Sequence, residues 1–244
     1  MMICLRPAFY LLALSFVTVL PPRGFAEETP TNELVKGLIE EDLGVRKFSF
    51  GEVVNAASDK QVIPFDPDNP NHQFIAKKLH SALDDALIHM SRPDAPVRDL
   101  RRINEASRFF EDYLLKALNE VPELSCAVPA NRQGKEQRSG YPDLLITHAA
   151  SGTIFYLDPK LYEEKSRQSS LRTFYFEPRE RTLKINHNAV HLLVGIAHDG
   201  NDGAWTFTRW EVVDLSHLQV RLKAEFQASN RDLYRPAAIV GASE

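Results

Sequence analysis

The chain has 244 residues, of which 43% are hydrophobic, and 33 acidic residues outnumber 29 basic ones to give a formal net charge of −4. This length and apolar content are enough to build a hydrophobic core of ordinary size. The negative balance excludes a protein that attracts nucleic acid through its bulk charge, although a local basic groove could still bind it.

The first 26 residues have the pattern of a secretory signal peptide. Arg6 precedes an apolar run at residues 8–20, a pair of prolines ends the run, and Ala26 supplies a small residue for cleavage. Removal of Arg6 and Arg23 with this segment would change the net charge from −4 to −6. The run is too short to span a bilayer comfortably, and no later segment is longer and as apolar. We therefore expect a secreted or periplasmic protein with no membrane contact after cleavage.

Two amphipathic helices are predicted before the middle of the chain. Residues 71–90 carry apolar side chains at helical spacing. Residues 98–121 repeat this pattern, with Glu111 at the edge of the apolar stripe. We expect residues 27–97 to form a helical N-terminal part that packs on a single α/β domain at residues 98–244.

Two short apolar runs after these helices predict a β-hairpin. Residues 144–146 and 154–157 are rich in strand-forming side chains, and residues 150–152, Ala-Ser-Gly, favour a turn between them. Antiparallel pairing of the two runs would place the start of the first strand beside the end of the second.

Side chains with the chemistry of a metal site flank this hairpin. Asp143 directly precedes the first run, Asp158 directly follows the second, and Lys160 lies on the same strand face as Asp158. Two carboxylates held together suit Mg²⁺, and the amine lies where a phosphate would bind. The alternative is that all three are ordinary turn and strand-end residues with no metal.

The order Pro142-Asp143, then Asp158-Pro159-Lys160, resembles the PD-(D/E)xK nuclease superfamily, which has the restriction-endonuclease-like fold. The resemblance implies that Asp143 and Asp158 bind Mg²⁺, with Mn²⁺ as an alternative. It also implies that Lys160 positions or activates the attacking water and stabilises the transition state of phosphodiester hydrolysis.

The same family tends to place a glutamate on the helix that precedes the catalytic hairpin. The resemblance therefore implies Glu111 as a third acidic ligand. The other interpretation of Glu111 is a solvated residue on the face of a helix, because unpaired acids are seldom buried.

Two features depart from the family's pattern. Pro159 removes a ladder hydrogen bond from what should be an inner strand, although its carbonyl remains available to a metal. The interval 161–190 contains no long amphipathic run, whereas the family usually has a helix there. The resemblance therefore covers roughly residues 98–200.

Further strands are expected at residues 172–176, 191–198 and 205–213, and the alternating pattern from residue 218 to residue 226 favours another. Two basic stretches could line a groove for nucleic acid, or else be solvated loop charge. They are residues 132–138 and residues 165–167 together with Arg172.

Two other classes of function stay open. His187, His191 and His198, with an acid such as Asp199, could hold zinc in a secreted metallohydrolase, although the glutamate of the zincin signature is absent. A binding protein that keeps the nuclease scaffold without catalysis is the other alternative.

Taken together, the sequence predicts an α/β protein with a restriction-endonuclease-like core. A central mixed β-sheet would be flanked by helices, with a helical N-terminal extension. The expected function is an exported Mg²⁺-dependent endonuclease that acts on nucleic acid, with DNA as the expected partner.

Overall fold

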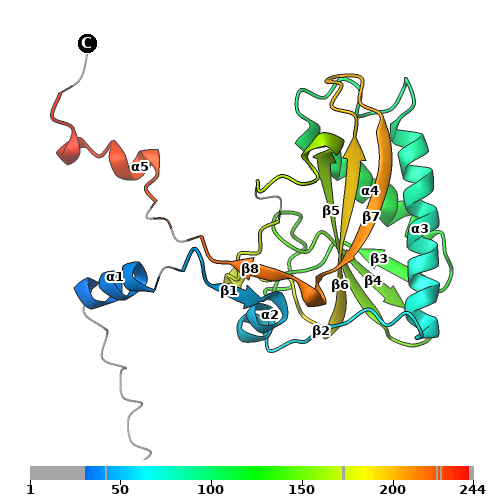
Figure 1. Ribbon diagram of the computed structural model, residues 1–244, viewed down its shortest axis with the longest axis horizontal. Coiled ribbons are helices and arrows are strands. Elements are labelled where there is room, and N and C mark those ends of the chain that lie inside the picture. The colour runs from blue at the N-terminus through cyan, green and yellow to red at the C-terminus, as the bar shows by residue number, and fades with distance from the viewer. Residues whose placement is uncertain (1–30, 42, 172–173, 224, 226, 242–244) are drawn as a thin grey trace, which may run out of the picture. The chain divides into compact units, whose positions relative to one another are not determined.

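The computed structural model of the chain describes residues 31–41, 43–171, 174–223, 225 and 227–241 (Figure 1). The signal peptide predicted at residues 1–26 lies outside them. The chain divides into two compact units, residues 1–42 and residues 43–244. The described part of the first unit holds one helix, α1 (Thr31–Glu40). The predicted division into residues 27–97 and 98–244 stays a prediction.

The described residues of the second unit form a six-stranded mixed sheet, a separate two-stranded sheet and four α-helices. The large sheet consists of β2 (Val62–Ile63), β3 (Leu124–Ala127), β4 (Leu144–His148), β5 (Ile154–Glu163), β6 (Ala189–His198) and β7 (Phe207–Asp214). The small sheet pairs β1 (Lys47–Ser49) with β8 (Gln219–Arg221). The helices are α2 (Phe50–Ser58), α3 (Pro70–Met90), α4 (Ser107–Asn119) and α5 (Asn230–Leu233). No helix among the described residues is long and apolar enough to cross a membrane.

The large sheet is mixed because its central strands pair in both directions. Strands β3, β4 and β5 are antiparallel neighbours, β5 and β6 are parallel, and β7 pairs antiparallel with β6. Short β2 pairs parallel with the beginning of β6. This arrangement of a mixed sheet flanked by helices confirms the predicted α/β fold class.

The two faces of the sheet pack against different layers. Helices α3 and α4 cover one face, and Phe155 and Leu157 of β5 belong to the core between them (Figure 1). Tyr156 points the other way and joins a second cluster with Phe50 of α2. Successive side chains of a strand point to opposite faces, so the even-numbered residues that follow Tyr156 continue on the second face.

The predicted hairpin is confirmed and joins β4 to β5. His148 N–H donates to the carbonyl of Thr153 at 2.9 Å, and the turn closes at Gly152, whose φ of +68° is a conformation that favours glycine. The predicted helix at 71–90 is also confirmed as α3, which Asn69 caps by accepting hydrogen bonds from the N–H groups of Asn71 and His72.

Other predicted elements need correction. The helix expected at 98–121 is shorter, because a 3₁₀ turn at Ile103–Ala106 precedes α4. Residues 174–176, the described part of the strand expected at 172–176, are not in a strand. Phe174 and Phe176 instead pack edge-on against the ring of Phe50, so their apolar side chains are used in the second cluster without strand pairing. The strand expected over 218–226 is only the three residues of β8.

Candidate active site

Strands β4 and β5 part at one end of the sheet, and the predicted acidic residues lie at this fork. The two strands pair as far as Leu144 and Leu157, and the N–H of Asp143 donates to the Leu157 carbonyl at 3.1 Å. Strand β5 then continues to Glu163 with β6 as its partner. Asp143 and Asp158 are therefore the first residues beyond the paired stretch, one on each strand.

The structure brings the predicted trio into contact. Lys160 Nζ lies 2.6 Å from Asp158 Oδ2 and 3.3 Å from Asp143 Oδ2. The same nitrogen lies 3.4 Å from the carbonyl oxygen of Pro159. Three oxygen atoms thus surround one cation, as the hairpin pattern predicts.

Pro159 is accommodated because of where its missing N–H would point. The carbonyl of Leu157 faces β4, and alternation along a strand places the backbone groups of residue 159 on the same side. Strand β4 has already ended there, so no ladder hydrogen bond is lost. Pro159, which departs from the pattern of the nuclease family, therefore does not interrupt β5, which is continuous from Ile154 to Glu163.

Burial makes the fork electrostatically strained. Asp158 is 1% exposed, and burial together with the nearby Asp143 carboxylate raises its pKa to about 8, although Lys160 opposes the shift. Burial alone would lower the pKa of Lys160, but Asp158 and Asp143 outweigh it and hold that pKa above its ordinary value. Lys160 therefore stays charged near neutral pH.

Glu111 lies at the margin of this cluster. Burial raises its pKa to about 7, with the Asp143 carboxylate as the next cause. Arg138 is 3.9 Å from its carboxylate, and pairs more closely with Asp112 at 2.8 Å. Glu111 is thus close enough to the fork for the Asp143 charge to affect its pKa, but it is not one of the groups in contact with Lys160. Its role as a ligand stays a prediction.

Sequence reasoning missed a second lysine. Lys184 is completely buried, and its Nζ donates to the carbonyl of Gln137 at 3.0 Å. Its neighbours Leu183 and Ile185 pack in the second core cluster, and Lys184 lies between them on the extended segment that leads to β6. Burial lowers its pKa to about 8, although the negative charges of Asp143, Asp158 and Glu111 oppose this shift.

The histidines of the zinc alternative do not form a site. The Nδ1 of His191 is 2.7 Å from Tyr141 Oη, and that of His187 is 3.1 Å from Tyr156 Oη. His198 Nδ1 accepts the N–H of Gly200, and the carboxylate of Asp199 accepts backbone N–H groups in its own turn. Within the described ranges no three His, Cys, Asp or Glu side chains are gathered closely enough to hold a metal ion, so the three histidines and Asp199 do not form the zinc site of this alternative.

The fork nevertheless fits a hard divalent cation in its donor set. Asp143 and Asp158 offer carboxylate oxygens and Pro159 a carbonyl, all within 3.4 Å of the Lys160 ammonium. Asp158 Oδ2 is buried, and its contact is the ion pair with the Lys160 ammonium at 2.6 Å, which does not have the geometry of a hydrogen bond. The set contains two acidic side chains, and water would have to complete the shell around Mg²⁺.

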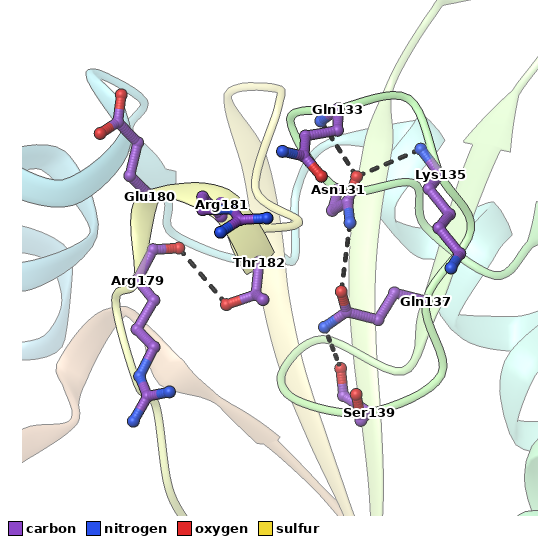
Figure 2. Close-up of a pocket in the computed structure, with 9 residues that line it drawn as sticks. All are labelled: Asn131, Gln133, Lys135, Gln137, Ser139, Arg179, Glu180, Arg181 and Thr182. Atoms are coloured by element: carbon purple, nitrogen blue, oxygen red, sulfur yellow. Dashed lines mark hydrogen bonds between the residues drawn. The ribbon is translucent and has the colours of Figure 1, made fainter.

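The predicted basic stretches have different positions. Residues 132–138 belong to a loop that precedes the fork in the sequence, and Figure 2 shows that Gln133, Lys135 and Gln137 of this loop line a hollow. Arg167 instead makes hydrogen bonds of 2.7 and 2.9 Å to Glu211, and Lys165 is exposed. Arg172 lies outside the described residues.

Comparison with known proteins identifies the family. The family model described as "MjaV: Type II restriction enzyme MjaV family" matches residues 43–237. The chain belongs to this family. It is also similar to the type II restriction enzyme MjaV of Methanocaldococcus jannaschii, with 27% identity over 206 residues that cover 80% of this chain and 89% of the relative. The match begins where the second compact unit begins and includes the whole fork.

Proposed function

We propose that this protein is a metal-dependent endonuclease that hydrolyses phosphodiester bonds of DNA. The observation that carries the proposal is the fork itself, where Asp143, Asp158 and the Pro159 carbonyl converge on the Lys160 ammonium. Membership of a type II restriction enzyme family supports DNA as the substrate.

In the proposed mechanism, Asp143, Asp158 and the Pro159 carbonyl would hold Mg²⁺ or Mn²⁺. When bound, the ion would supply positive charge for the scissile phosphate and lower the pKa of a nucleophilic water, whose proton would pass to solvent. Asp158 must be ionised to bind it, and the bound ion would offset the burial that raises the pKa of this carboxyl.

Lys160 acts as a charged donor in this mechanism. Because its pKa is held above the ordinary value, its amine is a poor acceptor of a proton from water. Its ammonium would instead orient the attacking water and donate to a non-bridging phosphate oxygen. Fixed donors of this kind favour the transition state, in which negative charge develops.

Plasmid cleavage tests this proposal directly. We expect wild-type protein to nick or linearise supercoiled DNA with Mg²⁺ and to stop when the metal is chelated. Asp158→Asn keeps the size of the side chain but removes the charge that binds the cation, so cleavage should fall by two orders of magnitude or more, about as for loss of a central electrostatic group. Binding of DNA without cleavage under every metal condition would favour the scaffold-only binding protein.

A further inference from the structure

A hollow of about 730 Å³ lies between two segments that are far apart in the sequence, residues 131–139 and residues 179–182. Figure 2 shows its lining, which combines amide, hydroxyl and charged side chains. The lining residues are Asn131, Gln133, Lys135, Gln137, Ser139, Arg179, Glu180, Arg181 and Thr182.

One wall is a loop that Asn131 holds in shape. The Asn131 side chain is 6% exposed, and its Oδ1 accepts the N–H groups of Gln133 and Lys135 at 3.0 and 3.1 Å. Its Nδ2 donates to Gln137 Oε1 at 3.1 Å, and Gln137 Nε2 donates to the carbonyl of Ser139 at 2.9 Å. These two amides are therefore used within the loop.

Both walls are fixed to each other and to the fork. The N–H of Arg132 donates to the carbonyl of Leu183 at 3.0 Å, directly after the second wall. The buried Lys184 donates to the Gln137 carbonyl, and the loop continues through Tyr141 into Asp143. A ligand in the hollow would thus sit on a preformed surface beside the acids of the fork.

Among the lining side chains whose polar ends have no partner in the described residues, two are directed across the hollow. Gln133 and Arg181 extend toward each other from opposite walls, whereas Glu180 and Arg179 extend away (Figure 2). Arg179 also pairs with Glu177 at 2.6 Å. In the part of the chain that the structure describes, the side chains of Gln133 and Arg181 have no hydrogen bond or ion pair.

We propose that this hollow reads the edges of DNA base pairs next to the cleaved phosphate, with Gln133 and Arg181 as the residues that set sequence preference. The inference rests on the proposed function and adds where that substrate is recognised. A glutamine amide can bond both N6 and N7 of adenine, and an arginine guanidinium can bond both O6 and N7 of guanine. Lys135, with a single charged nitrogen, suits a phosphate.

Sequence selection measures this role separately from cleavage. The full chain is incubated, without divalent cation, with DNA duplexes that carry a short randomised core, and bound duplexes are sequenced. We expect the wild type to select a defined sequence. Gln133→Ala and Arg181→Ala should each relax the preference at one position by about five-fold to a hundred-fold, the usual weight of a bidentate base contact.

Arg179→Ala is the matched control, because it removes the same charge from the same wall but from a side chain that points away. It should weaken binding of all duplexes evenly and leave the preferred sequence unchanged. Circular dichroism of each variant checks the fold, which exposed substitutions should preserve.

The possible results separate this inference from the proposed function. Unchanged preferences in Gln133→Ala and Arg181→Ala, or a wild type that selects no sequence, would overturn the base-reading role even if the plasmid is cleaved. A wild type that selects a sequence through Gln133 and Arg181 without cleaving it would support base reading and contradict the nuclease proposal.

Discussion

At the scale of single residues, the Lys160 ammonium explains how two acids can be packed at the end of a buried strand. Asp158 is almost inaccessible, and a second carboxylate beside it would make ionisation costly. The ammonium compensates part of that charge, and a divalent cation would compensate more. The fork is therefore stable without metal and electrostatically prepared to bind it.

Lys184 gives the first prediction at this scale. Replacement by methionine removes a buried amine whose lowered pKa shows that the folded state disfavours its charge. The free energy of unfolding at pH 7 should rise by about 1 kcal/mol, because the gain in desolvation exceeds the lost hydrogen bond to Gln137. DNA cleavage should fall about tenfold or more, because the loop loses its hydrogen bond to Lys184 and the acids of the fork lose a nearby positive charge. Urea unfolding and plasmid cleavage measure the two effects, and a stable variant with full activity would contradict a role for Lys184 at the site.

The burial of the His191 imidazole predicts that the stability of the fold depends on pH. Burial lowers its pKa to about 3, whereas the unfolded chain has the ordinary value of 6.5. Between these values the unfolded state binds the extra proton, so stability decreases as the pH falls from 6.5 toward 3. The contribution of one such group approaches about 1.4 kcal/mol per pH unit. His191→Leu should reduce this slope in urea unfolding measured across the range, and an unchanged slope would argue against a neutral buried imidazole.

At the scale of elements, the hairpin could be predicted because its strands, turn and flanking acids are adjacent in sequence. The position of Lys184 could not be predicted, because a hydrogen bond to the carbonyl of Gln137, 47 residues earlier in the chain, connects it to the loop that leads to the fork. Residues 174–176 misled the pattern for a related reason, since their aromatic rings pack on Phe50 without backbone pairing. Local periodicity reports burial, and it cannot distinguish an extended segment packed on a core from a strand in a sheet.

Strand β5 provides a test of how the fork is built. Because the backbone of Pro159 faces the side where β4 has ended, Pro159→Ala adds an N–H that no strand partner requires, and it keeps the carbonyl. Stability should change by less than about 1 kcal/mol, and Mg²⁺-dependent cleavage should persist within a few-fold. Thermal unfolding and plasmid cleavage are the measurements. A loss of cleavage in a folded variant would mean that the proline ring itself shapes the site.

At the scale of the whole molecule, the family match and the compact second unit both begin at residue 43. The segment before it carries the predicted signal peptide, which we propose directs export of the nuclease. This proposal concerns residues 1–26, which lie outside the described residues, and it rests on their sequence pattern alone.

Export has a direct test in the mass of the mature chain. When the full-length protein is expressed with its own N-terminus in a bacterial host, the exported fraction should begin at Glu27, directly after Ala26. Substitution of Ala26 by a bulky residue should slow this cleavage, because the peptidase selects small residues there. Intact-mass measurement decides the question, and an uncleaved chain retained in the cytoplasm would contradict export.

The central claim is that the fork of β4 and β5 is a metal-dependent phosphodiesterase site whose ammonium takes part in the reaction. The most direct test compares the rate of supercoiled plasmid cleavage, with saturating Mg²⁺ and protein in excess, for the wild type, Lys160→Ala and the exposed control Lys47→Ala. The account predicts that Lys160→Ala cleaves the plasmid more slowly by about a hundred-fold or more, while its affinity for DNA is unchanged. Lys47→Ala should cleave at the wild-type rate. Cleavage by Lys160→Ala at the wild-type rate, or cleavage that continues when the metal is chelated, would contradict it.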